Sequence, residues 1–465
     1  TERIRFSVQS PLTDGATYYW RVRAQKTGGG GTWGTWSETY SFTYVSDTDP
    51  SEWLQTTDAQ FNKGVLYDAE VYGANSVRIL QTTPSEALVA YGEGAITTPR
   101  YRVWDGSAWS AEADALDVGG VIQWVQVKPG TTRDEYVMGI HDANNDVNVQ
   151  VFDGVADTWG DLVEVTATAN DTTRRAFDVV YETASGDAMV VYCTGTNAAY
   201  RIWNGTTWSG ATTITTASTN NCNYIALASD PTSDEIVLVT RDTSAGATDY
   251  EALVWSGSAW GNSVTLGTIT DTNNEGIAVV YEESGGQAIV TTSNGGNTSF
   301  LWTAWNGIEW STPIAQTIGD DYQWGTLKAD VGSDNLALCY VDTDNDIGLV
   351  RWTGESWQTS QEFDTGGLTD LGRGVSCEFE TTAGRDGYIM IPYSDTTNAR
   401  YRSWNGTTLS GESTLSTITE SWEVGSVRTG DGNILTYFHD SVNTQYDFSY
   451  WDGSTWSAAQ TLETS

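Results

Sequence analysis

The chain has 465 residues, 39% of them hydrophobic, which is enough to bury a substantial core. Its 61 Asp and Glu outnumber 22 Lys and Arg, and the formal charge of -39 repels nucleic acid and anionic lipid surfaces. No run of about 18 apolar residues occurs, so we expect no membrane insertion in this segment. The 22 Trp, 23 Tyr and 48 Gly, beside only 8 Pro, favour strands and tight turns and predict an all-β protein.

Two N-terminal segments carry alternating aromatic residues. Residues 12–24 and 36–44 resemble the closing strands of a fibronectin type III domain, in which a Tyr follows a turn and alternate side chains point inward. The resemblance implies that residues 1–45 are the C-terminal half of a fibronectin type III-like β-sandwich. The exposed apolar face of such a half would need strands from before Thr1 or from a neighbouring chain to cover it. Residues 46–60 are predicted to be a linker.

A tryptophan-rich repeat fills the rest of the chain. Each copy contains an aromatic-x-Gly turn, and the first aromatic residues of the eight turns are Trp104, Phe152, Trp203, Trp255, Trp305, Trp352, Trp404 and Trp451. Their spacing of 47 to 52 residues is the length of a four-stranded propeller blade. We therefore predict an eight-bladed β-propeller over residues 61–465.

Each copy is expected to contain an inner strand, a second strand, a third strand that ends at the turn, and an outer strand. In the second copy the predicted strands include residues 121–127, 135–140 and 162–166. Asn-Gly and Asp-Gly pairs predict type I′ hairpins, with the flanking Trp residues packed across the hairpin or against the next blade. The ring could be closed by a strand from residues 61–73 or from residues 458–463, and the sequence leaves both open.

The four cysteines are expected to form two disulfides. Cys193 and Cys339 fall on the second strand of one repeat, and Cys222 and Cys377 fall on the inner strand of the next. Because adjacent blades bring such strands together, we predict the bonds Cys193–Cys222 and Cys339–Cys377. Together with the acidity of the chain, they favour an extracellular or cell-surface location.

Four Asn-x-Ser/Thr sequons in predicted turns or loops are glycosylation candidates, the alternative being that they are turn residues only. They begin at Asn170, Asn204, Asn297 and Asn405.

Three arginines precede the third-strand Trp by two residues and therefore share its strand face. They form the pairs Arg102 with Trp104, Arg201 with Trp203, and Arg402 with Trp404. One interpretation is a sugar-binding notch between blades. The other is an ion pair between an Arg and a carboxylate of the neighbouring blade, with stacking on the Trp.

An acidic turn offers the one candidate metal site. Asp342, Asp344 and Asp346 alternate as the first ligands of calcium loops do, although Ile347 separates the third Asp from Gly348. An ordinary acidic turn is the alternative. No cofactor other than this Ca²⁺ is predicted.

The Trp-Asp-Gly-Ser-x-Trp turns resemble the blades of propeller lectins such as the fucose-binding family. They are also similar to propellers of bacterial and archaeal surface proteins that carry fibronectin type III neighbours. Sialidases are the enzyme comparison, but their turn has a residue between Asp and Gly, whereas Asp452 and Gly453 are adjacent. His141 and His439, expected to be solvated turn residues, assemble no Ser/His/Asp arrangement.

We therefore predict that the chain is not an enzyme. The expected role is a non-catalytic extracellular or cell-surface module for adhesion, display or the structure of an appendage. Its partners would be other protein subunits or cell-surface glycans. The alternative is a carbohydrate-binding propeller lectin, and a glycosidase is the least favoured function.

Overall fold

The computed structural model describes a set of ranges that covers most of the repeat region. They are residues 17–20, 40–43, 77–80, 87–92, 94–104, 108–170, 174–217, 221–242, 250–267, 275–331, 333–365, 373–382, 384–395, 398–415, 421–429, 432–440 and 445–464. The chain divides into two compact units, Thr1–Phe61 and Asn62–Ser465. Among the described ranges there is no helix of the length and apolarity that a membrane span requires.

In the first unit, two strands pair as the alternating aromatics predict. Strand β1 (Thr17–Trp20) runs antiparallel to β2 (Tyr40–Thr43), with Tyr18 opposite Phe42. The other residues of the predicted fibronectin-like half, and the predicted linker, lie outside the described residues. The fibronectin assignment therefore stays a prediction.

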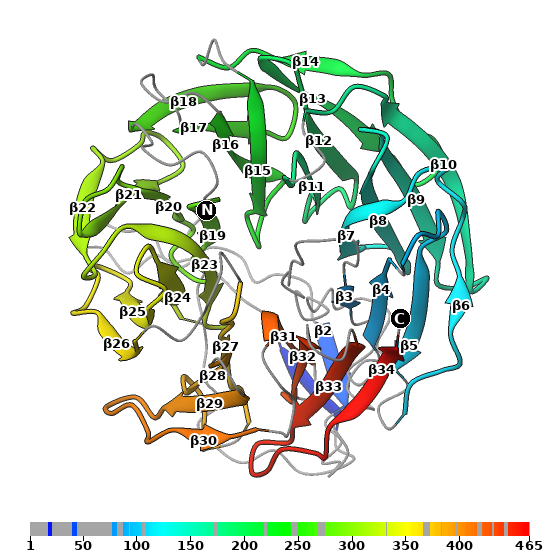
Figure 1. Cartoon of the computed structure of the whole chain (residues 1–465). Helices are drawn as coiled ribbons and strands as arrows, with labels where there is room; N and C mark the ends of the chain where they lie inside the picture. The colour runs from blue at the N-terminus through cyan, green and yellow to red at the C-terminus, as the bar shows by residue number, and fades with distance from the viewer. Residues whose placement is uncertain are drawn as a thin grey trace. The chain divides into compact units, whose positions relative to one another are not determined.

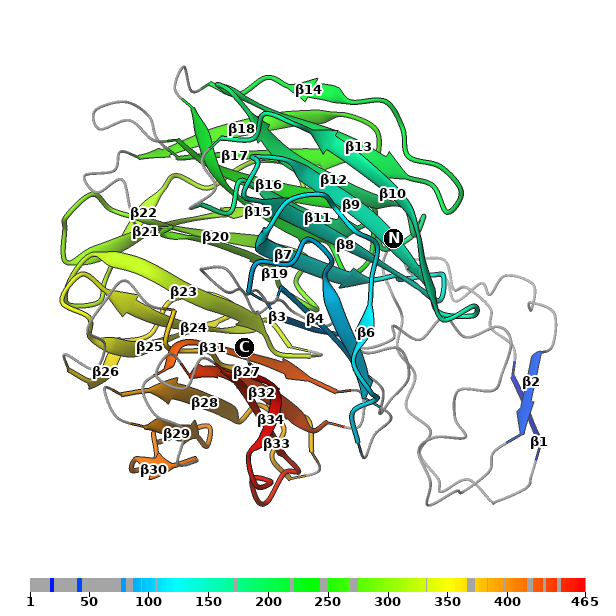
Figure 2. The same ribbon diagram turned by 45° about the vertical axis from the view of Figure 1, so that its right-hand side comes forward.

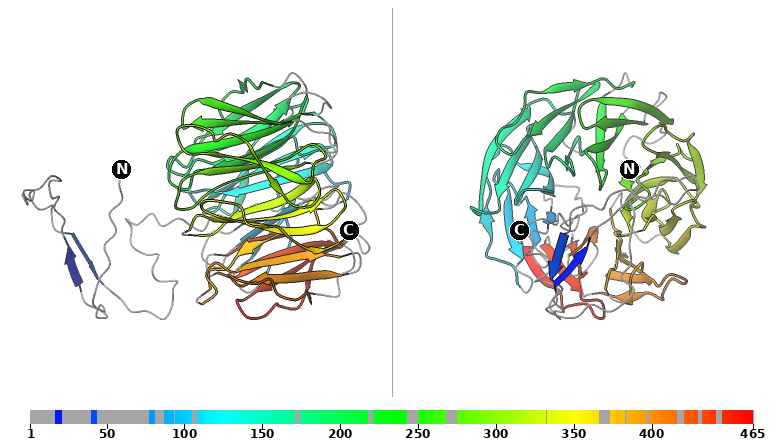
Figure 3. Two further views of the ribbon diagram at one scale, coloured as in Figure 1. Left: turned by 90° about the vertical axis from the view of Figure 1, so that its left-hand side faces the viewer. Right: turned by 180° about the vertical axis from the view of Figure 1, so that it is seen from behind.

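The second unit is a ring of eight four-stranded antiparallel sheets, numbered here as blades 1 to 8 (Figure 1). Every blade uses four consecutive strands, and the first of them lies nearest the ring axis. Figure 2 shows the strands of each blade side by side, and the right-hand view of Figure 3 shows the ring from behind. The predicted eight-bladed propeller is confirmed.

The blades have the following strands. Blade 1 contains β3 (Val77–Leu80), β4 (Ala87–Tyr91), β5 (Arg100–Trp104) and β6 (Ala113–Asp114). Blade 2 contains β7 (Ile122–Pro129), β8 (Glu135–Asp142), β9 (Val147–Asp153) and β10 (Thr158–Thr166). Blade 3 contains β11 (Phe177–Tyr181), β12 (Ala188–Thr194), β13 (Asn197–Trp203) and β14 (Thr212–Ile214). Blade 4 contains β15 (Cys222–Ser229), β16 (Glu235–Asp242), β17 (Tyr250–Ser256) and β18 (Trp260–Gly267).

The second half of the ring follows the same order. Blade 5 contains β19 (Ile277–Tyr281), β20 (Ala288–Ser293), β21 (Ser299–Trp305) and β22 (Ile314–Thr317). Blade 6 contains β23 (Tyr322–Ala329), β24 (Asn335–Asp342), β25 (Ile347–Thr353) and β26 (Gln361–Asp364). Blade 7 contains β27 (Glu378–Phe379), β28 (Ile389–Ser394), β29 (Ala399–Trp404) and β30 (Ser413–Thr414). Blade 8 contains β31 (Ser421–Arg428), β32 (Ile434–Asp440), β33 (Gln445–Trp451) and β34 (Gln460–Thr464).

The ring closes between blades 8 and 1 by side-chain packing. Strand β34 is the fourth strand of blade 8 itself, so residues 458–463 contribute to the last blade, while residues 61–73 lie outside the described residues. Across the junction, the Trp104 ring lies 5.6 Å from Phe448 and 5.9 Å from Tyr450, centroid to centroid. The described strands of blades 1 and 8 thus exchange no strand.

Apolar side chains fill the spaces between neighbouring blades. The middle strands are buried on both faces, since every residue of β8 and of β4 is buried. The hydrophobic clusters join adjacent blades, for example Val239 of blade 4 with Val290 of blade 5. A blade is therefore stabilised mainly by its two neighbours.

The repeated turn differs from its predicted type. Trp203 and Trp208 form a bridge across the hairpin, and Asn204 N–H donates to Thr207 O at 3.4 Å. Only Gly205 in this turn has positive φ, at 85°, so the turn follows the II′ pattern with Gly in the first central position rather than type I′. Asn204 Oδ1 accepts from the Thr206 and Thr207 N–H groups, which explains why Asn or Asp precedes the glycine.

One of the two predicted disulfides is present. Cys193 on β12 is bonded to Cys222 on β15, with Cα atoms 5.3 Å apart. Cys339 and Cys377 are free and buried, so the prediction of a second bond is wrong for this structure. Cys377 Sγ faces the carbonyl oxygens of Thr326 and Ala337 at 3.7 and 3.8 Å. Burial and the neighbouring Cys377 raise the pKa of the Cys339 thiol, which disfavours the thiolate that oxidation requires.

We expect two free thiols per chain in the purified native protein. The check is alkylation after unfolding without reductant, followed by intact-mass measurement. A native protein with no free thiol would reinstate the Cys339–Cys377 bond.

Candidate functional site

The tryptophans of the predicted sugar notch are not available to a ligand. Trp104, Trp203 and Trp404 are 4%, 4% and 5% exposed. Each packs between blades, and the Arg351 guanidinium of blade 6 lies 3.7 Å from the Trp404 ring centroid. In the sugar-notch interpretation, the Trp faces would therefore not be the ligand contact, because the Trp side of the strand faces the neighbouring blade.

Most of the repeat tryptophans hold a carboxylate of the preceding blade. At five junctions the indole Nε1 donates to a buried or partly buried Glu over 2.5 to 3.2 Å; the pairs are Trp203–Glu135, Trp255–Glu182, Trp305–Glu235, Trp352–Glu282 and Trp451–Glu380. The acceptor alternates: it begins the second strand in blades 2 and 4 and follows the first strand in blades 3, 5 and 7. The repeat thus has a paired character, and its tryptophans join blades.

The arginines lead to a different set of side chains. In blade 7, Arg402 donates to Ser410 O at 3.0 Å and, across the junction, to Phe363 O of blade 6 at 3.1 Å. Beside it, Tyr393 donates to Glu412 Oε2 at 2.8 Å. Arg400 lies 3.7 Å from the same Glu412. We call Tyr393, Arg400, Arg402 and Glu412 the blade 7 cluster.

Blade 1 repeats this arrangement. Tyr91 donates to Glu112 Oε2 at 2.6 Å, and Arg102 donates to Ser110 O at 3.1 Å and to the Tyr91 hydroxyl at 3.4 Å. Arg100 lies 3.6 Å from Glu112. Tyr91, Arg100, Arg102 and Glu112 form the blade 1 cluster.

Arg201 of blade 3 does not build such a cluster. The positions of Arg400 and Glu412 are occupied in blade 3 by Ala199 and Ala211. The three predicted arginines therefore fall into two kinds, of which Arg102 and Arg402 belong to charged clusters.

The clusters combine charge with partial solvent exposure. In blade 7 the side chains of Arg400 and Glu412 are 21% and 38% exposed. Burial, followed by the hydrogen bond to Glu412, raises the pKa of the Tyr393 hydroxyl, which therefore stays a donor. Burial, and then Glu412 and Asp395, raises the pKa of Asp364 on the neighbouring β26. Guanidinium donors beside carboxylate acceptors suit ligands with adjacent hydroxyl groups.

Sequence reasoning missed the tyrosines and glutamates of these clusters. A signal was present: only blades 1 and 7 have Glu eight residues after the turn Trp together with Arg two and four residues before it. We did not recognise this pattern from the sequence because the Glu lies after the hairpin, just before the fourth strand, whereas the Arg and Trp lie on the third.

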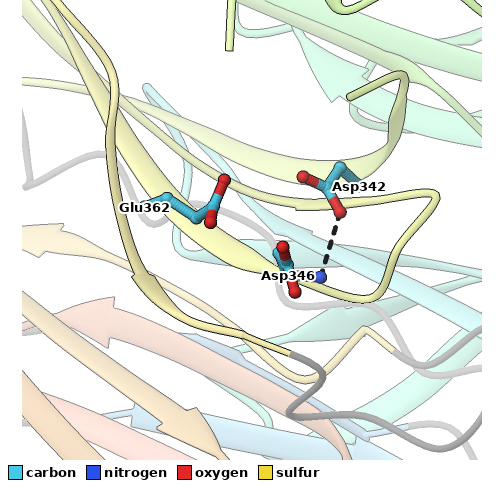
Figure 4. A group of neighbouring side chains, drawn as sticks. All are labelled: Asp342, Asp346 and Glu362. Atoms are coloured by element: carbon cyan, nitrogen blue, oxygen red, sulfur yellow. Dashed lines mark hydrogen bonds between the residues drawn. The ribbon is translucent and has the colours of Figure 1, made fainter. Parts of the chain in front are cut away.

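The predicted calcium residues are only partly brought together. Asp342 at the end of β24 and Asp346 in the following loop lie with Glu362 of β26, and one oxygen of each is within 4.8 Å of the others (Figure 4). Asp344 is exposed, and its pKa is raised chiefly by Asp320 rather than by these residues. The structure thus groups Glu362, rather than Asp344, with Asp342 and Asp346. Burial and the neighbouring carboxylates raise the pKa of Asp342 to about 7.

The two histidines lie in separate blades. His141 on β8 is buried rather than solvated, with its ring 6.4 Å from Phe177. His439 on β32 packs on Tyr446 at 4.9 Å. They share no site.

The sequons differ in how their amide is used. Asn170 Nδ2 donates to Gly195 O and Cys222 O at 2.8 and 2.7 Å, and Asn297 Nδ2 donates to Asn294 O. Asn204 and Asn405 are exposed at hairpin ends and use Oδ1 as the acceptor of the turn.

In a host that attaches N-glycans, we expect modification at Asn204 and Asn405 and not at Asn170. The atom that would carry the glycan at Asn170 already makes two hydrogen bonds. Peptide mapping by mass spectrometry checks this, and a modified Asn170 in folded material would contradict it.

No protein-family model and no curated protein matches the sequence. Among solved structures, the BP39L lectin from Burkholderia pseudomallei is similar at a TM-score of 0.52 and 13% identity, over 73% of this chain and 98% of that chain. AofleA from Arthrobotrys oligospora has a TM-score of 0.41 and 10% identity, over 73% and 85%. The Aleuria aurantia lectin with α-methyl-L-fucoside has a TM-score of 0.40 and 13% identity, over 73% and 95%. The similarity to BP39L places the chain among β-propellers by fold.

Proposed function

We propose that the propeller is a non-catalytic carbohydrate-binding module that holds glycan hydroxyl groups at the blade 1 and blade 7 clusters. The observation that carries the proposal is the repetition of one arrangement, Tyr–Arg–Arg–Glu, at two equivalent positions. The set occurs in two of the eight blades and is partly open to solvent, so it can meet a ligand.

The chemistry of the clusters favours a neutral sugar. Arg and Glu side by side offer hydrogen-bond donors and acceptors to neighbouring hydroxyl groups of a sugar. The Tyr hydroxyl donates to the Glu carboxylate and holds it in position. The formal charge of -39 disfavours sialylated or sulfated glycans through long-range repulsion. BP39L, which shares the propeller fold, is itself a lectin. A glycan-binding propeller suits the adhesion or display role, outside the cell, that the composition predicts.

A glycan array with the 465-residue chain tests the proposal, followed by calorimetric titration of a neutral sugar that binds and of α-methyl-L-fucoside. We expect two sites per chain in the native protein. Arg402→Ala should weaken one of the two sites about 10-fold to 100-fold, the range for a lost charged hydrogen bond, and Arg102→Ala with Arg402→Ala should weaken both sites by that factor.

The matched control is Arg201→Ala, which removes an Arg at the equivalent position of a blade without the cluster. It should leave binding unchanged. Glu112→Gln with Glu412→Gln provides a second double variant that does not touch the junction between blades. A folded chain that binds no glycan on the array, or one that loses binding equally with Arg201→Ala, rejects the proposal.

A further inference from the structure

Three carboxylates, those of Asp342, Asp346 and Glu362, meet at the edge of blade 6. Neither Asp342 nor Glu362 makes an ion pair with a basic residue in the part of the chain that the structure describes. Asp342 is fully buried, and its Oδ1 accepts from the N–H groups of Asp344 and Asp346 at 3.1 and 3.0 Å. Its Oδ2 is buried and has no hydrogen-bond partner. A buried carboxylate oxygen without a donor is costly, so a cation at this position would stabilise it.

Blade 2 provides an internal comparison. Asp142 occupies the equivalent position, and its Oδ1 accepts from Asn144 and Asp146 N–H in the same way. There, however, Asn148 Nδ2 lies 3.5 Å from Asp142 Oδ2 and supplies the donor. In blade 6 that position is Gly348, where an added Cβ would lie 2.3 Å from the Tyr340 ring. The packing of Tyr340 thus excludes the side chain that satisfies the carboxylate in blade 2.

We propose that Asp342, Asp346 and Glu362 bind one Ca²⁺ ion, which takes the place of the missing donor at Asp342 Oδ2. Figure 4 shows Asp342 and Asp346 on the loop and Glu362 on β26 facing a common space. Their oxygens lie within 4.8 Å of one another, a spread that an ion with Ca–O distances of about 2.3–2.6 Å can span. Mg²⁺ requires shorter distances of about 2.0–2.1 Å and near-octahedral geometry, so it suits this site less.

The ion would connect the β24–β25 loop to the outer strand of the same blade. Glu362 directly precedes Phe363, whose carbonyl oxygen accepts from Arg402. Ca²⁺ would therefore order the strand against which blade 7 packs. This inference stands independently of glycan binding.

The test is calorimetric titration of CaCl₂ into the chelator-treated 465-residue chain. We expect one ion per chain with a dissociation constant of about 10⁻⁴ to 10⁻³ M, the range of extracellular calcium modules, and weaker binding of MgCl₂. Glu362→Gln replaces a charged ligand by a neutral one and should weaken Ca²⁺ binding at least about tenfold. Because Glu362 is exposed, the variant should keep its fold. Asp342→Asn should do the same while its Oδ1 still accepts the two loop N–H groups.

The matched control is Glu164→Gln in blade 2, which alters the counterpart of Glu362 beside the satisfied Asp142. It should leave Ca²⁺ binding unchanged. Absence of a bound ion in the native chain, or equal weakening by Glu164→Gln and Glu362→Gln, would overturn the proposal. Binding of Mg²⁺ as strong as that of Ca²⁺ would overturn the assignment to calcium.

Discussion

Replacing Glu275 by Ala is expected to destabilise the propeller by about 3–5 kcal/mol, the cost of leaving buried charges without their partner. Glu275 precedes the inner strand of blade 5 and accepts from Arg175 Nη2 at 2.8 Å and from Arg373 Nη2. The three residues come from blades 3, 5 and 7 and are at most 6% exposed. Burial alone would raise the pKa of Glu275, but Arg373 and then Arg175 outweigh it and lower the pKa.

Urea denaturation at neutral pH measures this effect. Arg373 also lies 4.8 Å from the Trp124 ring, so it stays in place when its ion-pair partner Glu275 is lost. The control is Asp114→Ala, which removes a 61% exposed partner of Arg100 and should cost less than about 1 kcal/mol. If both variants unfold at the same urea concentration, the network contributes no more than a surface pair. Exchanging all three residues for apolar ones of similar volume should restore much of the stability.

Glu282→Gln should make the chain more stable above pH 7 by up to about 3 kcal/mol, using 1.36 kcal/mol per pKa unit. Burial, with a further contribution from Asp334, raises the pKa of Glu282 from 4.5 to about 7. The folded chain therefore binds this proton more tightly than the unfolded chain does. The stability contribution of the group is complete below about pH 4.5 and is lost as the pH rises through 7.

Unfolding free energies at pH 5 and pH 8 measure the prediction. The native chain should lose stability between them, and Glu282→Gln should lose less because Gln does not ionise. Its amide oxygen can still accept from Trp352 Nε1. Glu380 is the matched control, because it holds the same position in blade 7 but is paired with Arg385 at 2.6 Å. Glu380→Gln should be destabilising at both pH values. A pH dependence that is the same with and without Glu282 would contradict the prediction.

The sequence was sufficient to predict the eight blades but not the side-chain contacts between neighbouring blades. The turn spacing predicts eight blades because each hairpin is a local event, and Cys193–Cys222 follows from placing adjacent blades side by side. The partners of the tryptophans lie about 70 residues earlier in the chain, as Trp305 and Glu235 do. A repeat length of one blade gives every blade the same pattern. It therefore does not reveal that the Glu that accepts from the Trp indole alternates between two positions in successive blades.

The carboxylates that meet in blade 6 differ from the set proposed from the sequence for a related reason. Alternating Asp residues in sequence suggest alternating ligands, but the Asx-type turn uses Asp342 to cap the loop and leaves Asp344 beside Asp320. The third carboxylate, Glu362, comes from another strand, 16 residues after Asp346. Side chains that meet through sheet pairing carry no short-range spacing for sequence analysis to detect.

The junction between blades 8 and 1 gives the ring a preferred place to open. At the other seven junctions the chain itself runs from one blade into the next, whereas the described strands of blades 8 and 1 meet through aromatic packing, such as Trp109 against Phe448 at 5.4 Å. Separating two packed faces exposes apolar surface without breaking a sheet, so local opening here needs less disruption than tearing a blade. In this respect the propeller is a linear series of eight sheets, and side-chain packing holds the first described sheet against the last. Under tension or during folding, it would part and rejoin at this junction.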